Sequence, residues 1–244
     1  MIVKDIEVTP EPPKRLRLAP DERRTSILDA AQRLFFERGW DDVTIADVLT
    51  EAGISKGGFY HHFAAKEDLL DGVIGRFTIE ALAAAEAARA ATSGNALARF
   101  NAFLAETNRW KAEQGPLLKF YIDVLLLPGN DILFDRIQAA GIAAALPIVL
   151  DMINQGVDEG TFDVPDAGLV TETIMAMGIA RRAIMVSSFE AAKAGDLERA
   201  VSILDARMTA EGALIDRMLG LPQNSIVLTN PKEFRLMMSA IAWD

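Results

Sequence analysis

Residues 44–63 constrain the fold of this chain most, because two short helices must be joined there by very few residues. Thr44 is a favourable helix N-cap, and Asp47 three residues later completes a capping-box pattern. Apolar residues then recur at helical spacing up to Gly53, which suits the left-handed conformation that ends many helices. Ser55 can cap a second helix only two residues later. The sequence therefore predicts two helices that cross sharply, as in a helix-turn-helix unit.

The second of these helices combines an open N-terminus with an exposed set of hydrogen-bond donors. Gly57 and Gly58 fall in its first turn, where each costs about 1 kcal/mol relative to alanine. They leave backbone N–H groups accessible to a phosphate. Phe59 and Phe63 are four residues apart and can both face a core. The residues between them, which carry donors for phosphates and base edges, are Tyr60, His61 and His62. This arrangement is what a major-groove recognition helix requires.

Four segments of this region resemble the signature of TetR-type transcriptional regulators. They are Thr44–Asp47, Ala52–Gly57, Tyr60–Phe63 and Lys66–Glu67, and residues 23–39 resemble the first helix of the same domain. The rest of the chain carries no motif but is compatible in length and helical character. The resemblance implies an N-terminal domain that binds a double-stranded DNA operator as a dimer. It also implies a C-terminal helical domain that binds a small effector, which releases the DNA.

The resemblance and the local chemistry together predict which residues contact DNA. Thr44 should direct the N–H groups of its helix to a phosphate, and Lys66 should supply a further phosphate contact. Gly58 should allow close approach of the backbone; Gly58 and His61 occupy positions that vary within the family. The full predicted set is Thr44, Ser55, Lys56, Gly57, Gly58, Tyr60, His61, His62 and Lys66. Which of these touch phosphates and which touch bases stays open at this point.

The helical pattern predicts an all-α chain in four parts. These are a disordered tail (1–20), the DNA-binding domain (21–66), a helical ligand-binding and dimerisation domain (67–219) and a C-terminal tail with a short helix (220–244). The first tail is rich in proline, and its Lys14, Arg15 and Arg17 belong either to a disordered leader or to an arm that adds phosphate contacts.

Helices are predicted after the DNA-binding domain at 66–91, 96–113, 117–127, 131–155 with a bend at Pro147, 166–193, 197–219 and after Asn230. Gly72 and Gly75 fall inside the first of them, either for close helix packing or as a pivot that transmits the ligand state. Residues 197–219 carry a seam close to a heptad and further apolar surface on a second side. This pattern predicts a homodimer through the helices at 166–193 and 197–219, unless both sides are covered within one protomer.

Aromatic residues and methionines of the middle helices would suit a largely apolar pocket between helices. The candidates for ligand binding are Phe103, Trp110, Phe120, Tyr121, Phe134 and Met175, with Tyr121 or Asn108 supplying polar contacts. Side chains of these types fill hydrophobic cores more often than they line pockets. If they line a pocket, the effector is expected to be mostly hydrophobic or aromatic.

Composition excludes several other classes of protein. Without cysteine there can be no disulfide framework, thiol catalysis or thiolate zinc site. Because His61 and His62 are adjacent, they do not face one another on a helix, and no metal site is expected. No catalytic or cofactor motif is present, so no enzyme and no cofactor are expected.

The N-terminal residues do not resemble a signal peptide. The longest apolar run, residues 137–150, is shorter than the roughly 18 residues that cross a bilayer. A cytoplasmic protein without a membrane partner is therefore expected.

Overall charge does not favour DNA binding, because the net charge is −10. The prediction of a regulator, most simply a repressor, therefore depends on the motif and its local geometry. A transcriptional activator, a helical sensor that has lost DNA binding and an enzyme built on the helical domain stay as alternatives.

Overall fold

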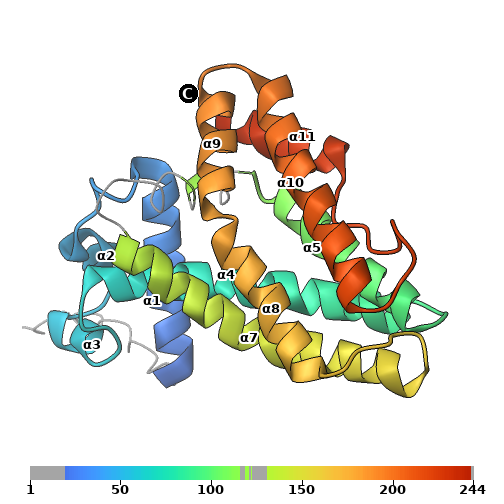
Figure 1. Ribbon diagram of the computed structural model, residues 1–244. Helices are drawn as coiled ribbons and strands as arrows, with labels where there is room; N and C mark the ends of the chain where they lie inside the picture. The colour runs from blue at the N-terminus through green and yellow to red at the C-terminus, as the bar shows by residue number, and fades with distance from the viewer. Residues whose placement is uncertain (1–19, 116–118, 121, 123–130, 243–244) are drawn as a thin grey trace, which may run out of the picture.

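The structure is a computed structural model that describes residues 20–115, 119–120, 122 and 131–242. The regular elements of these residues are all α-helices, which confirms the predicted fold class (Figure 1). They are α1 (Pro20–Arg38), α2 (Ile45–Glu51), α3 (Lys56–Tyr60), α4 (Lys66–Ala91), α5 (Ala96–Glu113), α7 (Asp131–Asp158), α8 (Ala167–Ala180), α9 (Arg182–Lys193), α10 (Leu197–Met218) and α11 (Pro231–Ala242). Of the predicted helix at 117–127, the structure describes residues 119, 120 and 122, which are helical. Tyr121 and the basic residues of the first tail lie outside the described residues.

One apolar core joins α1, α2, α3 and the first half of α4. At Gly72, α4 passes so close to α1 that an added Cβ would lie 2.6 Å from Cδ2 of Leu28. The same core continues into Phe120 and into Leu133 and Phe134 of α7. The predicted domain boundary after residue 66 thus falls at the start of a helix whose first half belongs to the N-terminal core.

A second core fills the other end of the molecule, where α5, α8, α9, α10 and α11 pack around the second halves of α4 and α7. α4 and α7 run lengthwise between the two ends, as Figure 1 shows. α7 is also long and apolar enough to cross a membrane by length and composition alone, a test that the core helices of soluble proteins pass as well.

The helix predicted at 166–193 is in fact two helices, because the chain turns at Arg181. Hydrogen bonds continue on both sides of the turn, from Arg181 N–H to Met177 O at 3.1 Å and from Met185 N–H to Arg181 O at 3.0 Å. The side chain of Arg181 bonds to Glu211 of α10. This contact joins the turn to α10 across 30 residues of sequence.

The heptad-like seam of α10 is buried inside the protomer. α10 packs against α9 and α11, and the carbonyl oxygen of Ile226 lies 3.1 Å from the position that a Cβ at Gly212 would take. The seam residues Val201, Leu204, Met208, Ile215 and Leu219 are all buried. The seam is therefore covered within one chain, whereas Leu214, on the second apolar side of this helix, is 43% exposed. Further exposed apolar side chains lie on α8, where Leu169 is 61% and Ile179 46% exposed.

Candidate functional site

The turn between α2 and α3 is built by two side-chain caps. The Thr44 hydroxyl accepts a hydrogen bond from Asp47 N–H at 3.2 Å, while the Asp47 carboxylate accepts one from Thr44 N–H at 2.8 Å. Ser55 Oγ accepts a bond from Gly58 N–H at 3.2 Å. Gly53 has a φ of 62°, the left-handed conformation that the predicted helix end requires. The capping box and the tight turn of the sequence analysis are thus both present.

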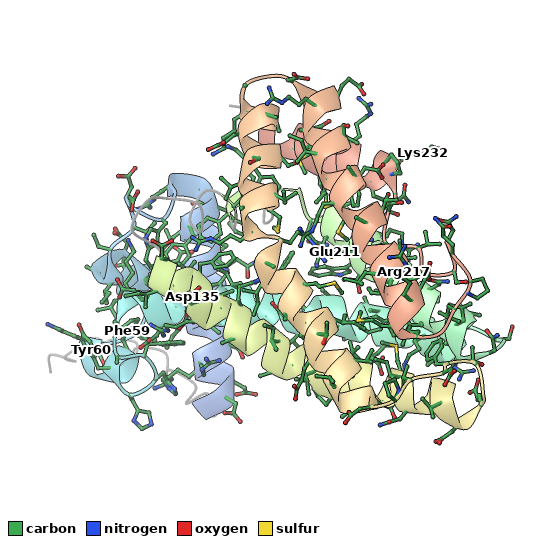
Figure 2. All side chains as sticks on the ribbon, viewed as in Figure 1. Phe59, Tyr60, Asp135, Glu211, Arg217 and Lys232 are labelled. Carbon is green, nitrogen blue, oxygen red and sulfur yellow. The ribbon has the colours of Figure 1, made fainter. Side chains whose placement is uncertain are left out.

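α3 is anchored on one side and exposed on the other. Phe59 is completely buried and Phe63 nearly so, and both belong to the N-terminal core. Tyr60 is 48% exposed and projects at the edge of the molecule, as Figure 2 shows. The ammonium of Lys56 lies 5.9 Å from the centre of the Tyr60 ring, and His61 is exposed beside them. The exposed side of α3 therefore presents donors and a positive charge.

Two arginines at the start of α1 extend this surface, and sequence reasoning did not include them in the site. The guanidinium of Arg24 lies 5.2 Å from the centre of the Phe63 ring. His62 is partly buried, and its pKa is lowered first by burial and then by the charges of His61, Arg23 and Arg24. The sequence feature that could have identified them is a pair of arginines in the first helix of a helix-turn-helix domain. Only the contact of Arg24 with Phe63, just after α3, shows that they adjoin the recognition helix.

Lys66, predicted to supply a further phosphate contact, lies against the turn after α1. Its ammonium donates a hydrogen bond to the Trp40 carbonyl oxygen and lies 4.2 Å from the centre of the Trp40 ring. Burial lowers the pKa of Lys66. In this structure the side chain ties the start of α4 to the turn after α1.

The predicted ligand-binding residues do not come together in one place. Phe120 stacks on Phe35 with ring centres 5.7 Å apart, and Trp110 packs on Phe77 at 4.7 Å. Phe134, with Phe120 and Trp110, belongs to the N-terminal core, whereas Phe103 and Met175 belong to the C-terminal core. Tyr121 lies outside the described residues, and Asn108 donates a hydrogen bond to the Leu228 carbonyl at 3.1 Å. The aromatic side chains that the sequence suggested for a pocket therefore pack between the two ends of the molecule.

A cluster of charged residues lies inside the C-terminal half, and sequence reasoning missed it. Glu211 of α10 is almost fully buried and faces the break between α8 and α9 (Figure 2). Arg181 and Arg207 both donate to its carboxylate. Burial raises the pKa of Glu211, but these hydrogen bonds outweigh burial and hold the pKa below its usual value. Burial, and then the charge of Arg181, lowers the pKa of nearby Lys111 to about 8.

Residues 27–73 match the sequence profile of the family described as bacterial regulatory proteins, tetR family. The transcriptional repressor KstR2 of Rhodococcus jostii is 46% identical over 55 residues, which are 22% of this chain and 27% of that protein. The transcriptional repressor BepR of Brucella suis biovar 1 is 36% identical over 63 residues, which are 26% of this chain and 30% of that one. The chain thus matches less than a third of the length of these curated relatives.

Similarity to solved structures extends over most of the chain. The crystal structure of RolR in complex with resorcinol covers 90% of this chain and 94% of its own, with a TM-score of 0.53 and 19% identity. A TetR transcription regulator from Haloarcula marismortui covers 78% of this chain and 95% of its own, with a TM-score of 0.53 and 23% identity. At these identities the likeness shows that the fold is shared.

Proposed function

We propose that the chain, whose residues 27–73 match the TetR family profile, is a ligand-responsive transcriptional regulator of that family. The proposed activity is repression, through binding of a palindromic operator as a dimer in the cytoplasm. One observation carries the proposal: α3 is anchored by Phe59 and Phe63 while Lys56, Tyr60 and His61 stay exposed beside one another. The proposed role is regulatory and involves no catalysis.

The proposed DNA contacts are those of α3 and its immediate surroundings. Lys56 and the backbone at Ser55 and Gly57 bind phosphates, and Gly58 lets the backbone approach. Tyr60, His61 and His62 supply further phosphate and base contacts. We add Arg23 and Arg24, because they adjoin His62, and keep Thr44 as the residue that positions the start of α2. Lys66 acts in this proposal through its contact with Trp40, which holds α4 against the turn.

Dimerisation is assigned to the helices between residues 166 and 219. Exposed Leu169 and Ile179 on α8 and Leu214 on α10 supply apolar surface for a second copy. A two-fold interface would set two copies of α3 in successive half-sites. The helical part after α4 is assigned to effector binding, in keeping with RolR, which has the same fold and was solved with the ligand resorcinol.

The test is a selection of random duplex DNA by the purified full-length protein at about 0.15 M salt. An enriched palindrome with half-sites about one helical turn apart is the expected outcome. Lys56→Ala should then weaken binding of all sequences alike, because a phosphate contact carries no sequence information. Lys232→Ala is the matched control, since Lys232 is an exposed lysine on α11 at the other end of the molecule (Figure 2). Absence of any enriched sequence, from protein refolded to remove bound ligand, would refute the proposal.

A reporter gene behind the selected operator distinguishes repression from activation. Repression predicts higher expression when the gene for this protein is deleted, whereas activation predicts lower expression. Unchanged expression together with a clear operator would contradict a regulatory role at that site.

A further inference from the structure

One arginine of α7 reaches the start of α4, next to the recognition helix. The guanidinium of Arg136 pairs with Asp71 and lies 3.4 Å from a carboxylate oxygen of Asp68. Leu133 and Ile137, which flank Arg136 on α7, are buried in the N-terminal core. Figure 1 shows that this end of α7 lies along α4 toward α2 and α3, and α4 and α7 pack against each other. The first turns of α7 therefore hold the DNA-binding domain by apolar packing and by a shared ion pair.

Asp68 uses its two carboxylate oxygens for different partners. One oxygen faces Arg136. The other accepts hydrogen bonds from Ala64 N–H at 2.8 Å and from Ala65 N–H at 3.1 Å. These two alanines are the whole connection between Phe63, which anchors the end of the recognition helix in the N-terminal core, and the first residue of α4. The contact that begins at Arg136 thus ends on the segment that carries α3.

A dimer that binds two half-sites needs its two recognition helices at a fixed distance and angle. α3 has only five residues, so its direction relative to the rest of the protomer depends on what holds its ends. The contribution that the Arg136 ion pair must make is small. If losing it lowers the correctly oriented fraction of each α3 about threefold, that is about 0.6 kcal/mol, and two recognition helices together lose about tenfold in affinity.

We propose that Arg136 is a positioning residue for operator binding. Through Asp68 and Asp71 it sets the angle of α3 relative to the body of the protomer, by which we mean α5 and α7 to α11. It thereby sets the half-site spacing that the dimer accepts. This inference rests on the proposed function and deepens it. Arg136 itself touches no DNA in this proposal, so its effect appears only when both recognition helices of a dimer bind at once.

Arg136→Gln in the full-length protein tests the inference on two duplexes. One is the palindromic operator recovered by selection, and the other carries a single half-site. Affinity for the operator should fall about tenfold, whereas affinity for the half-site should stay the same. Equal operator affinity of wild type and variant would refute the inference. An equal loss on both duplexes would refute it too, because Arg136 would then act on the DNA-binding domain alone, by neutralising carboxylates close to the DNA.

Half-site spacing gives a readout that a purely structural ion pair would not change. One base pair added or removed between the half-sites turns one of them by about 35° relative to the other. Wild type should therefore bind such operators much more weakly than the selected one. Arg136→Gln should discriminate less, because a loosely held α3 can adjust to the new angle. Loss of affinity by the same factor for every spacing would contradict a positioning role.

Arg235→Gln is the matched control. The side chain of Arg235 is 48% exposed, against 49% for Arg136, and it also pairs with a carboxylate of another helix, Glu198 of α10 at 2.6 Å. That ion pair lies in the C-terminal half, so its loss should change neither operator affinity nor spacing discrimination. Arg136→Lys keeps the charge and should recover part of the affinity. Equal effects of Arg136→Gln and Arg235→Gln, or no recovery by lysine, would overturn the inference.

Asp68→Ala separates the two partners of Asp68. It removes the hydrogen bonds to the segment after α3 as well as the ion pair, so it should weaken binding of the single half-site too. Melting temperatures of the arginine variants should stay within about 2–4 °C of wild type, because exposed ion pairs contribute little to folding stability. A larger fall in Arg136→Gln would make the pair a folding contact and overturn the positioning role.

Failure of this inference is distinguishable from failure of the proposed function. Wild-type protein that selects no operator would refute the function before any variant is compared. Wild-type protein that selects a palindrome, with an Arg136→Gln variant that binds it equally well and with the same spacing preference, would keep the function and refute the role of Arg136.

Discussion

Gly72 and Gly75 of α4 form a natural pair of test sites, because one is crowded and the other is open. A Cβ at Gly72 would lie 2.6 Å and 3.2 Å from the two Cδ atoms of Leu28, which is itself 1% exposed and has little room to move. No such atom lies within 4 Å of a Cβ at Gly75. Alanine at either position removes the conformational freedom of glycine in a helix, worth about 1 kcal/mol. The two substitutions therefore share the gain from replacing a helical glycine and differ only in the contact of the new methyl group with α1.

The size of that difference follows from the cost of overpacking. An extra methyl group in a filled core costs about 1–3 kcal/mol. Gly72→Ala should accordingly be between neutral and about 2 kcal/mol less stable than wild type, while Gly75→Ala should be up to about 1 kcal/mol more stable. For a chain of this size each kcal/mol moves the melting temperature by about 2–4 °C, so the variants should melt several degrees apart.

Thermal unfolding of both variants, followed by circular dichroism at one protomer concentration, measures this difference. Equal stabilisation by the two substitutions would refute the packing argument, because Leu28 would then relax at no cost. Operator affinity is the second measurement. Gly72→Ala should weaken it by altering the distance between α1 and α4, and Gly75→Ala should leave it unchanged. Weakening by Gly75→Ala instead would favour the alternative that these glycines form a pivot.

Two further predictions concern the helix-turn-helix unit. Thr44→Ala removes the side-chain cap of α2 and should cost about 1 kcal/mol in the free energy of unfolding, while Thr44→Ser should keep it; equal urea midpoints for the two would contradict the cap. His62 has a folded-state pKa below 6.5, so the unfolded chain binds its proton first, and stability should fall as the pH drops through that range. His62→Gln should flatten this slope in urea titrations, with His61→Gln as control, and an unchanged slope would assign it to other groups.

Local signals were sufficient to predict much of the fold. α4 and α5 begin and end at the predicted residues, 66–91 and 96–113, because caps and breaking residues lie in the adjacent sequence. Asn95 shows the mechanism: its side chain accepts a hydrogen bond from Ala98 N–H at 3.1 Å. The caps of α2 and α3 were predicted for the same reason. Such interactions span only a few residues, so their geometry can be predicted from the local sequence.

Long-range contacts could not be predicted in this way. Arg181 and Glu211 are 30 residues apart, and nothing around either residue indicates the other. The break between α8 and α9 and the charged cluster were therefore both missed. The aromatic residues could not be placed for a related reason. Their residue type predicts that they are buried but does not indicate in which of the two cores. Trp110 and Phe120 were candidates for a ligand pocket or a core, and they pack against the N-terminal core through partners that are distant in the sequence.

The two ends of the molecule are also joined by ion pairs, which begin beside the charged cluster. Arg182 follows Arg181 directly, pairs with Asp131 at 2.8 Å and lies 4.1 Å from the centre of the Phe134 ring. Both partners are at the start of α7, which places this end of α7 against the α8–α9 break. Arg181 of the charged cluster is thus directly followed by the residue that holds the start of α7.

The start of α7 is held in turn against α4, close to the recognition helix. Arg136 pairs with Asp71 and, at 3.4 Å, with Asp68. The other oxygen of Asp68 accepts hydrogen bonds from Ala64 N–H at 2.8 Å and Ala65 N–H at 3.1 Å, in the short segment that follows α3. A continuous chain of contacts does not by itself couple two sites. Coupling also requires an element that can adopt two arrangements. Two contacts lie along this route: the turn at Arg181, whose side chain is bonded to Glu211, and the close packing of α4 on α1 at Gly72. A shift at the start of α7 would therefore act on α4 through the ion pairs of Arg136.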